Sequence, residues 1–222
     1  MEAAKDGRAA RHKATLCTDE QKYKYTPYVR DPESQVRYWA IPGQEGYTHI
    51  LGGLEKDGKT GAISTEPENH NKMSHIRYQK VARIPVPDMV VEGDADDAEL
   101  LIVGFGSTYG HLLSATNVLR SRGHKVAMAQ VKFVNPLPAN IAEVLMRYPK
   151  VVVAEQNLGQ LAALLRIRVN GFAPYQYNQV KGQPFVVNDL VEEFERLLET
   201  KAVPSGAQTF DTKVLNAPNI NI

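Results

Sequence analysis

A glycine-rich turn, GFGSTYG at residues 104–110, is the first stretch whose residue types suit ligand chemistry. Glycines between a strand and a helix allow backbone N–H groups to approach a phosphate closely. The spacing here is G-x-G-x-x-x-G, one residue longer than the dinucleotide fingerprint. The next predicted strand ends in Lys132 and Phe133, where a dinucleotide site needs an acidic residue for the ribose. The pattern therefore disfavours a nicotinamide dinucleotide site.

The sequence contains no suitably spaced set of residues for nucleophilic catalysis or for metal binding. Ser107 has no neighbouring base, and its turn is not the G-x-S-x-G elbow of hydrolases. His70 and His75 are five residues apart, which is not the i, i+4 spacing that places two ligands on one helix face. Cys17 is the only cysteine, so the chain alone forms no disulfide and no cysteine-ligated zinc or iron–sulfur site. We assign no catalytic residue and no metal ligand.

The turns that follow buried strands are the better candidates for function, because ligands and partners meet an open parallel sheet at the carboxyl ends of its strands. Glu155 ends one such strand, where its carboxylate can accept hydrogen bonds from a partner or cofactor. The alternative, a cap on the following helix, is favoured over catalysis. The candidates for loops facing an interface or a cofactor are Gly106, Ser107, Thr108, Tyr109, Glu155 and Asn157.

Alternating strand and helix patterns in the sequence predict where these turns lie in the fold. Short apolar runs bounded by turn residues predict strands at 100–103, 125–133, 150–154 and 175–180. Helical periodicity predicts four helices. The first ends near Arg122, the second spans 139–148, the third spans 158–169, and the fourth begins after a cap at Asn188 or Asp189. Ser107 or Thr108 is predicted to cap the first of these helices. The predicted fold is α/β, a three-layer domain with a parallel sheet between helix layers and right-handed crossovers.

The first part of the chain has a different character. Tyrosines, prolines and glycines interrupt residues 23–61 too often for long helices or strands, and one amphipathic helix is expected over 67–83. About 60 residues of irregular structure cannot build an independent core. Their aromatic side chains pack either on the second half of the chain or on a partner outside it, and the sequence leaves both open. We expect disorder at 1–22 and 201–222.

Composition limits the remaining classes. The chain has 222 residues, is 43% hydrophobic and carries a formal net charge of +1. Such a charge gives no field that would argue for nucleic acid or an anionic membrane as partner. No apolar run approaches the roughly 20 residues that span a bilayer, and the N-terminal sequence has no apolar core of a secretory signal. We expect a cytoplasmic protein.

Seven motifs occur in the same order in one known family. They are PYVRDPE, WAIPG, HILGGLE, PENHNKM, GFGSTYG, NPLPAN and AEQNLGQLA, between about residues 25 and 200. With them the chain resembles the C-terminal portion of the alpha subunit of the thiamine-diphosphate-dependent 2-oxoacid:ferredoxin oxidoreductases, 2-oxoglutarate:ferredoxin oxidoreductase in particular. The resemblance implies a closing segment of a pyrimidine-binding domain plus connector at 23–88, and a domain like the transketolase C-terminal domain at 89–200.

The resemblance also implies a reaction and its partners. The family joins a 2-oxoacid, coenzyme A and oxidised ferredoxin to give an acyl-CoA, carbon dioxide and reduced ferredoxin, or runs the reverse. Thiamine diphosphate, Mg²⁺ and an iron–sulfur cluster are expected in the complex through the partner beta subunit, with none bound by this chain alone. Most of the pyrimidine-binding domain and its substrate motif are missing from the sequence. The chain is therefore expected to be a separately encoded or truncated portion of an alpha subunit that acts only in complex.

Two arginines are the candidates for substrate binding. A dianionic 2-oxoacid needs a fixed cation near its carboxylates, and a guanidinium binds a carboxylate in bidentate fashion. Arg37 and Arg30 precede the WAIPG motif and are the residues to test, with surface pairing to Asp31 or Glu33 as the alternative. Two other functions stay open: a non-catalytic scaffold module of a related oxidoreductase, and an independent nucleotide-binding α/β protein.

Overall fold

The computed structural model describes residues 16 and 25–201, and it divides the chain into two compact units, Met1–Pro87 and Asp88–Ile222. Each unit is described by itself. Apart from Leu16 and Lys201, the segments predicted to be disordered lie outside the described residues. None of the helices among the described residues combines the length and the hydropathy that crossing a bilayer requires.

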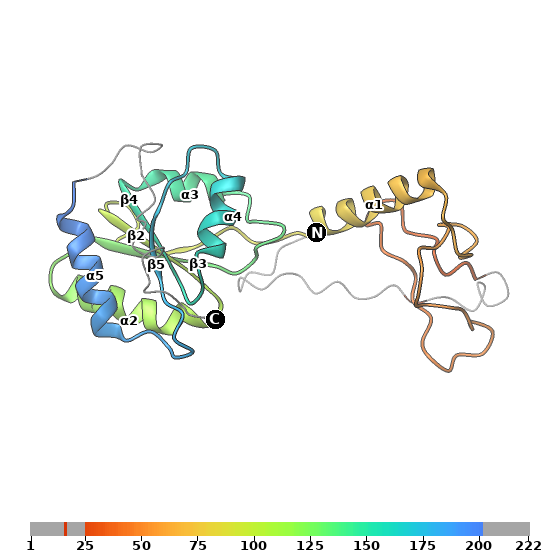
Figure 1. The fold of residues 1–222 in the computed structure, drawn as a ribbon, viewed down its shortest axis with the longest axis horizontal. Helices are drawn as coiled ribbons and strands as arrows, with labels where there is room; N and C mark the ends of the chain where they lie inside the picture. Colours follow the sequence, from red (N-terminus) through yellow and green to blue (C-terminus); the bar gives the residue numbers. More distant parts are fainter. Residues whose placement is uncertain (1–15, 17–24, 202–222) are drawn as a thin grey trace, which may run out of the picture. The chain divides into compact units, whose positions relative to one another are not determined.

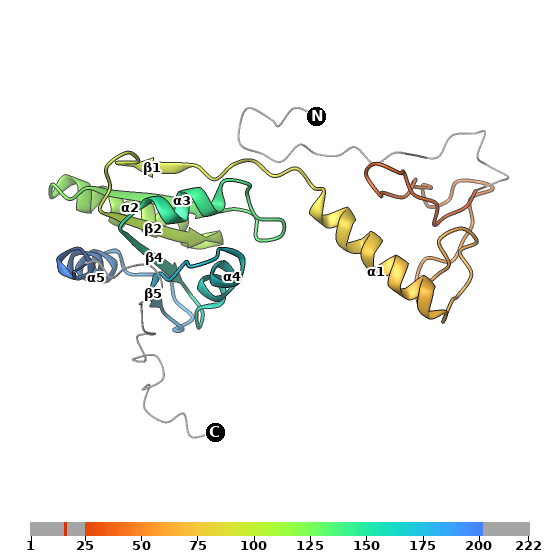
Figure 2. The ribbon, with the colours of Figure 1, turned by 90° about the horizontal axis from the view of Figure 1, so that it is seen from above.

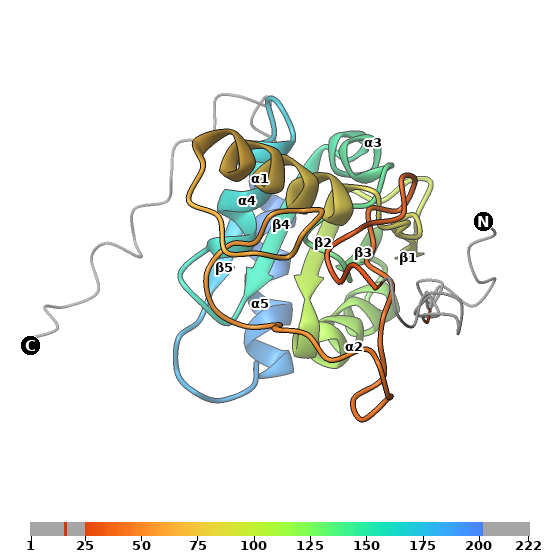
Figure 3. The ribbon, with the colours of Figure 1, turned by 90° about the vertical axis from the view of Figure 1, so that its right-hand side faces the viewer.

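The second unit is built on a five-stranded sheet in the order β1-β3-β2-β4-β5 (Figure 3). Strands β2, β3, β4 and β5 run parallel, and β1 pairs with β3 in the antiparallel direction. The strands are β1 (Val91–Gly93), β2 (Leu100–Phe105), β3 (Val126–Val131), β4 (Lys150–Glu155) and β5 (Tyr175–Asn178). The sheet is therefore parallel except at one edge.

Two helices cover each face of this sheet (Figure 1). On one face lie α2 (Tyr109–Ser121) and α5 (Val187–Glu199), and on the other lie α3 (Ile141–Arg147) and α4 (Gln160–Arg168). Alternation along β2 explains the layers: Leu101 and Val103 join the core under α3 and α4, and Leu100 and Ile102 join the core under α2 and α5. The three-layer α/β fold predicted from the sequence is confirmed.

The first unit has little regular structure besides α1 (Pro67–Ala82), which is seen along its length in Figure 2. Isolated bridges join Arg30 to Arg37 and Lys56 to Ile63. Only four of its described residues are buried, namely Tyr28, Tyr47, Lys56 and Met73. The prediction of an irregular aromatic segment followed by one helix is confirmed, and the small buried set agrees with the expectation that the segment builds no large core of its own.

Several local predictions were wrong. The sequence predicts no strand before residue 100, yet residues 91–93 form β1, because they pair with β3. Helix α5 begins at Val187, so Asn188 and Asp189 lie inside its first turn instead of capping it. Neither Ser107 nor Thr108 caps α2 with its side chain, because the Thr108 hydroxyl is bonded to Phe105. A short 3₁₀ turn, η2 (Gly106–Thr108), leads into the helix instead.

Candidate functional site

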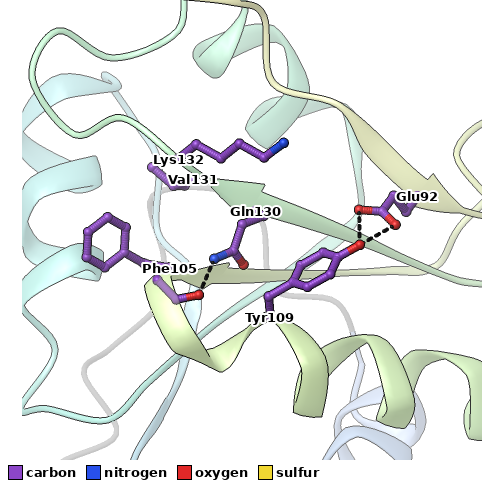
Figure 4. Close-up of a pocket in the computed structure, with 7 residues that line it drawn as sticks. Glu92, Phe105, Tyr109, Gln130, Val131 and Lys132 are labelled. Carbon is purple, nitrogen blue, oxygen red and sulfur yellow. Dashed lines mark hydrogen bonds between the residues drawn. The ribbon is translucent and has the colours of Figure 1, made fainter. Parts of the chain in front are cut away.

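A pocket of about 580 Å³ opens where β2 and β3 end (Figure 4). The register pairs Phe105 with Val131, so the two strands reach the same edge of the sheet together. Antiparallel β1 brings Glu92 to this edge from the opposite direction. The pocket is lined by Glu92, Phe105, Gly106, Tyr109, Gln130, Val131 and Lys132. Of the loop residues predicted from the sequence, Gly106 and Tyr109 line it.

The Tyr109 hydroxyl closes one side of the pocket. It donates to the Glu92 carboxylate, with distances of 3.2 Å to Oε1 and 3.0 Å to Oε2 (Figure 4). This hydrogen bond, with smaller contributions from burial and from the Glu92 charge, raises the pKa of Tyr109 above its usual value. The phenol therefore stays neutral at physiological pH. It presents an aromatic ring, and not an anion, to the pocket.

The turn at the base of the pocket depends on two glycines. Gly106 has a φ of +62°, a left-handed conformation that glycine adopts without strain, and its carbonyl accepts a 2.9 Å hydrogen bond from Gln130 Nε2. A Cβ at Gly104 would overlap the Leu112 side chain and lie 2.9 Å from Thr108 Oγ1. The glycine pattern singled out from the sequence thus serves a tight strand-to-helix turn.

Three pocket residues were missed by sequence reasoning. Glu92 was missed because β1 is too short to give a strand pattern, and Gln130 because a lone amide in a strand gives no signal. Lys132 was noticed only as an argument against a ribose site. It is exposed and has no ion-pair partner among the described residues. Its charge is available at the rim of the pocket.

The two candidates at the end of β4 and in the turn after it, Glu155 and Asn157, both accept hydrogen bonds from the start of α4. The buried Glu155 carboxylate accepts hydrogen bonds from the backbone N–H groups of Leu161 at 2.7 Å and Ala162 at 2.9 Å. Asn157 Oδ1 accepts from Gly159 at 2.8 Å and Gln160 at 2.9 Å. Both side chains satisfy donors of the first turn of α4 that have no partner inside the helix. In the described fold Glu155 serves as a helix cap, one of the two roles considered from the sequence.

In the first unit the structure brings Arg30 and Arg37 together. They face each other across an isolated antiparallel bridge, and the Arg37 guanidinium lies over the Tyr28 ring, 4.9 Å from its centroid. Arg30 Nη1 donates to the Gln35 carbonyl at 3.2 Å, and its buried Nε has no hydrogen-bond partner. Burial lowers the pKa of Arg30 below its usual value, and the charges of Arg37 and Arg77 lower it further.

No carboxylate among the described residues pairs with either member of this arginine pair. The surface pairing considered from the sequence is absent there, because Asp31 accepts hydrogen bonds from the Ser34 backbone and hydroxyl instead. Two adjacent uncompensated cations favour an anionic partner. The unpaired Arg30 Nε–H is itself buried and leaves one donor unsatisfied inside the unit.

Comparison with known proteins identifies a matching family model and several relatives of this chain. Residues 98–189 match the family model of the pyruvate:ferredoxin oxidoreductase core domain II. The 2-oxoglutarate oxidoreductase subunit KorA of Mycobacterium tuberculosis is 51% identical over 142 residues, which are 64% of this chain and 22% of that one. A 2-oxoacid:ferredoxin oxidoreductase 2 alpha subunit of Aeropyrum pernix is 32% identical over 160 residues, 69% of this chain and 25% of that one.

A solved structure agrees with these relatives. It is the 2-oxoglutarate:ferredoxin oxidoreductase of Magnetococcus marinus with 2-oxoglutarate, coenzyme A and succinyl-CoA bound, and it matches with a TM-score of 0.72 and 29% identity. The match covers 83% of this chain and 32% of that one, so the chain spans between about a fifth and a third of these relatives. The resemblance found in the sequence is confirmed: the chain is similar to part of the alpha subunits of 2-oxoacid:ferredoxin oxidoreductases, and its residues 98–189 match the pyruvate:ferredoxin oxidoreductase core domain II.

Proposed function

We propose that this chain works as part of the alpha subunit of a 2-oxoglutarate:ferredoxin oxidoreductase. The reaction breaks the bond between the carboxylate and the keto carbon of 2-oxoglutarate and releases carbon dioxide. The acyl group joins the sulfur of coenzyme A, the thiol proton is released, and two electrons pass to ferredoxin. The likeness to the Magnetococcus marinus enzyme over 83% of the chain carries this proposal.

The resident cofactors of the reaction belong, in this proposal, to the partner beta subunit. Thiamine diphosphate supplies carbanion stabilisation when bound, and it needs Mg²⁺ for its diphosphate. The chain has one cysteine, and its described residues include no group of three or more His, Cys, Asp or Glu able to hold a metal ion. This set of donors does not fit Mg²⁺ or an iron–sulfur cluster, so we derive no step through them on this chain.

The two units take different parts in the proposal. Residues 23–88 belong to the closing segment of a pyrimidine-binding domain with its connector, and residues 89–200 to a domain like the transketolase C-terminal domain. In the second unit Gly106, Ser107, Thr108 and Tyr109 follow β2 at the carboxyl edge of the sheet, and in this proposal they face the cofactor or another subunit. Ferredoxin and coenzyme A are reached through the complex.

The arginine pair, Arg30 and Arg37, binds the distal carboxylate of 2-oxoglutarate in this proposal. Its two guanidinium groups lack a carboxylate partner among the described residues, and Arg30 keeps one buried N–H unpaired. A bidentate guanidinium–carboxylate contact is shorter and stronger than a neutral hydrogen bond, and its fork fits a planar carboxylate. A 2-oxoacid that ends in a methyl group gains nothing from this pair.

The test compares two substrates in the assembled enzyme. The chain is expressed with the polypeptides encoded beside it, and reduction of ferredoxin is followed with 2-oxoglutarate or 2-oxobutyrate. For Arg37→Ala we expect the KM for 2-oxoglutarate to rise about 10- to 100-fold, the loss of one charged hydrogen-bonded contact. The KM for 2-oxobutyrate stays the same. Arg37→Lys, which keeps the charge but loses the fork, gives an intermediate KM.

Arg168→Ala is the matched control, because Arg168 is exposed on α4 in the second unit. It leaves both KM values unchanged. If changes at Arg30 and Arg37 leave turnover of both substrates untouched while the complex forms, the chain is a scaffold module. If the isolated chain binds a nucleotide tightly and assembles with no oxidoreductase subunit, it is an independent nucleotide-binding protein.

A further inference from the structure

The Arg37 guanidinium is held by an aromatic ring. Its central carbon lies 4.9 Å from the centroid of the Tyr28 ring, within the roughly 6 Å over which a ring attracts a cation. In the described part of the chain this guanidinium forms no hydrogen bond and no ion pair. Arg30 differs, because its Nη1 donates to the Gln35 carbonyl. The Tyr28 ring is therefore the group that fixes the Arg37 cation in this unit.

Tyr28 is itself fixed by residues far from it in sequence. It is 7% exposed, and its hydroxyl donates to the carbonyls of Ile50 at 2.9 Å and Leu51 at 3.2 Å. Gly61 lies beside the ring, where a Cβ would be only 2.9 Å from Tyr28 Cδ2. The φ of Gly61 is +73°, so both the space and the backbone conformation favour glycine there. The fold thus places the ring without help from a ligand.

Contact with a ring suits an arginine that binds an anion. A carboxylate partner would occupy the guanidinium N–H groups and compensate the charge, whereas an aromatic ring leaves the positive charge in place. The planar fork of donors then stays available for a carboxylate. A mobile arginine side chain loses rotamer entropy when a ligand immobilises it, and the ring contact removes part of this loss before the ligand binds.

We propose that Tyr28 is a positioning residue for Arg37, and that its ring holds the guanidinium where the distal carboxylate of 2-oxoglutarate binds. This inference rests on the proposed function, in which the arginine pair binds that carboxylate. Tyr28 acts only through Arg37 and makes no contact with the substrate. A weaker ring contact therefore weakens binding of 2-oxoglutarate but not of 2-oxobutyrate, and it has no effect once the Arg37 side chain is removed.

Fluorinated phenylalanines at position 28 test this inference in the assembled enzyme. Phenylalanine with zero, one, two or three ring fluorines replaces Tyr28, so all four variants lack the hydroxyl equally. Each fluorine withdraws electron density from the ring face and changes its shape little. We expect the KM for 2-oxoglutarate to rise stepwise, by about 3- to 30-fold over the series, the range of a cation–π contact. The kcat and the KM for 2-oxobutyrate stay the same.

The same four residues at position 172 provide the control. Phe172 is 5% exposed and lies in the core of the second unit. Fluorination of this ring alters a buried aromatic residue without touching the arginine pair. Both KM values therefore stay unchanged across the control series.

Two glycine variants test the inference from the other side of the contact. Gly61→Ala places a methyl group against the Tyr28 ring, displaces it and raises the KM for 2-oxoglutarate. Gly58→Ala is the matched control in the same turn, because its Cβ would meet only Met73 Sδ, at an ordinary 3.7 Å. It leaves the KM unchanged.

The Arg37→Ala background separates positioning from general damage to the unit. In that background neither the fluorine series nor Gly61→Ala changes the KM for 2-oxoglutarate further, as a double-mutant cycle requires of a residue that acts through Arg37. A constant KM across the fluorine series, or an equal rise with Arg37 absent, overturns the inference and leaves the proposed function standing. If Arg37→Ala alone does not raise this KM, the arginine site of the proposed function fails and the inference fails with it.

Discussion

Replacing Glu155 with glutamine tests whether this side chain serves the fold or a ligand. The residue is 2% exposed, and each of its carboxylate oxygens accepts one backbone N–H from the first turn of α4. Glutamine has nearly the same shape but offers only one acceptor. Its NH₂ group must face either the Leu161 or the Ala162 N–H, so one buried donor loses its partner.

The size of the effect follows from these contacts. Leaving one buried donor unsatisfied costs about 1–3 kcal/mol, and replacing the remaining charged acceptor by a neutral one costs about 1 kcal/mol more. We expect the free energy of unfolding to fall by about 2–4 kcal/mol. A domain of this size loses roughly 3–4 °C in Tm for each kcal/mol, so the Tm falls by about 6–16 °C.

Urea denaturation followed by circular dichroism measures this change, and hydrogen exchange locates it at the Leu161 and Ala162 amides. Glu143→Gln is the control, because that carboxylate is 71% exposed and forms a single surface ion pair with Arg147. It changes stability little, as exposed pairs do. Equal stability of the two variants, with unchanged exchange at both amides, would refute the capping role. Glu155 would then be free for a cofactor or a partner.

Two further predictions concern the second unit. Gly104→Ala places a methyl group against Leu112 and destabilises the unit by about 1–3 kcal/mol, whereas Gly110→Ala meets no atom within 4 Å and is neutral or stabilising in thermal unfolding. Hydrogen bonds from Arg120 lower the pKa of Asp94. The stabilisation is therefore complete above the unfolded pKa of about 3.9 and is lost as pH falls through the folded value, so urea midpoints of wild type and Asp94→Asn differ at neutral pH and converge in acid.

Much of the second unit can be predicted from the sequence, because its signals are local. The run at Leu100–Val103 has only long or β-branched apolar residues, and a strand buried on both faces needs that composition. Gly104 and Gly106 indicate the turn in the sequence. Only glycine fits the close packing at position 104 and adopts the positive φ at position 106 without strain. The family motifs then identified the relatives that the comparisons confirm.

Other features were decided by contacts between residues far apart in sequence. Strand β1 has three residues and no pattern of its own, and it exists because β3 offers a free edge to pair with. The pocket is lined by Glu92, Tyr109 and Gln130 from three different elements, so no residue spacing along the chain predicts it. The start of α5 at Val187 was missed for a related reason: packing of its apolar stripe set the helix boundary ahead of the residues that favour caps.

The two candidate sites show the same division. The residue types of Arg30 and Arg37 suggested an anion site, but only the fold shows that a backbone bridge pairs the two residues and that neither has a carboxylate partner in the described part of the chain. Likewise Glu155 had two possible roles in the sequence, and its hydrogen bonds select the cap. Sequence determined which chemical groups the chain carries and where the strands and turns lie, because those depend on local composition. Tertiary structure decided which groups meet and which are already satisfied, because hydrogen bonding and charge compensation depend on neighbours that the linear order does not reveal.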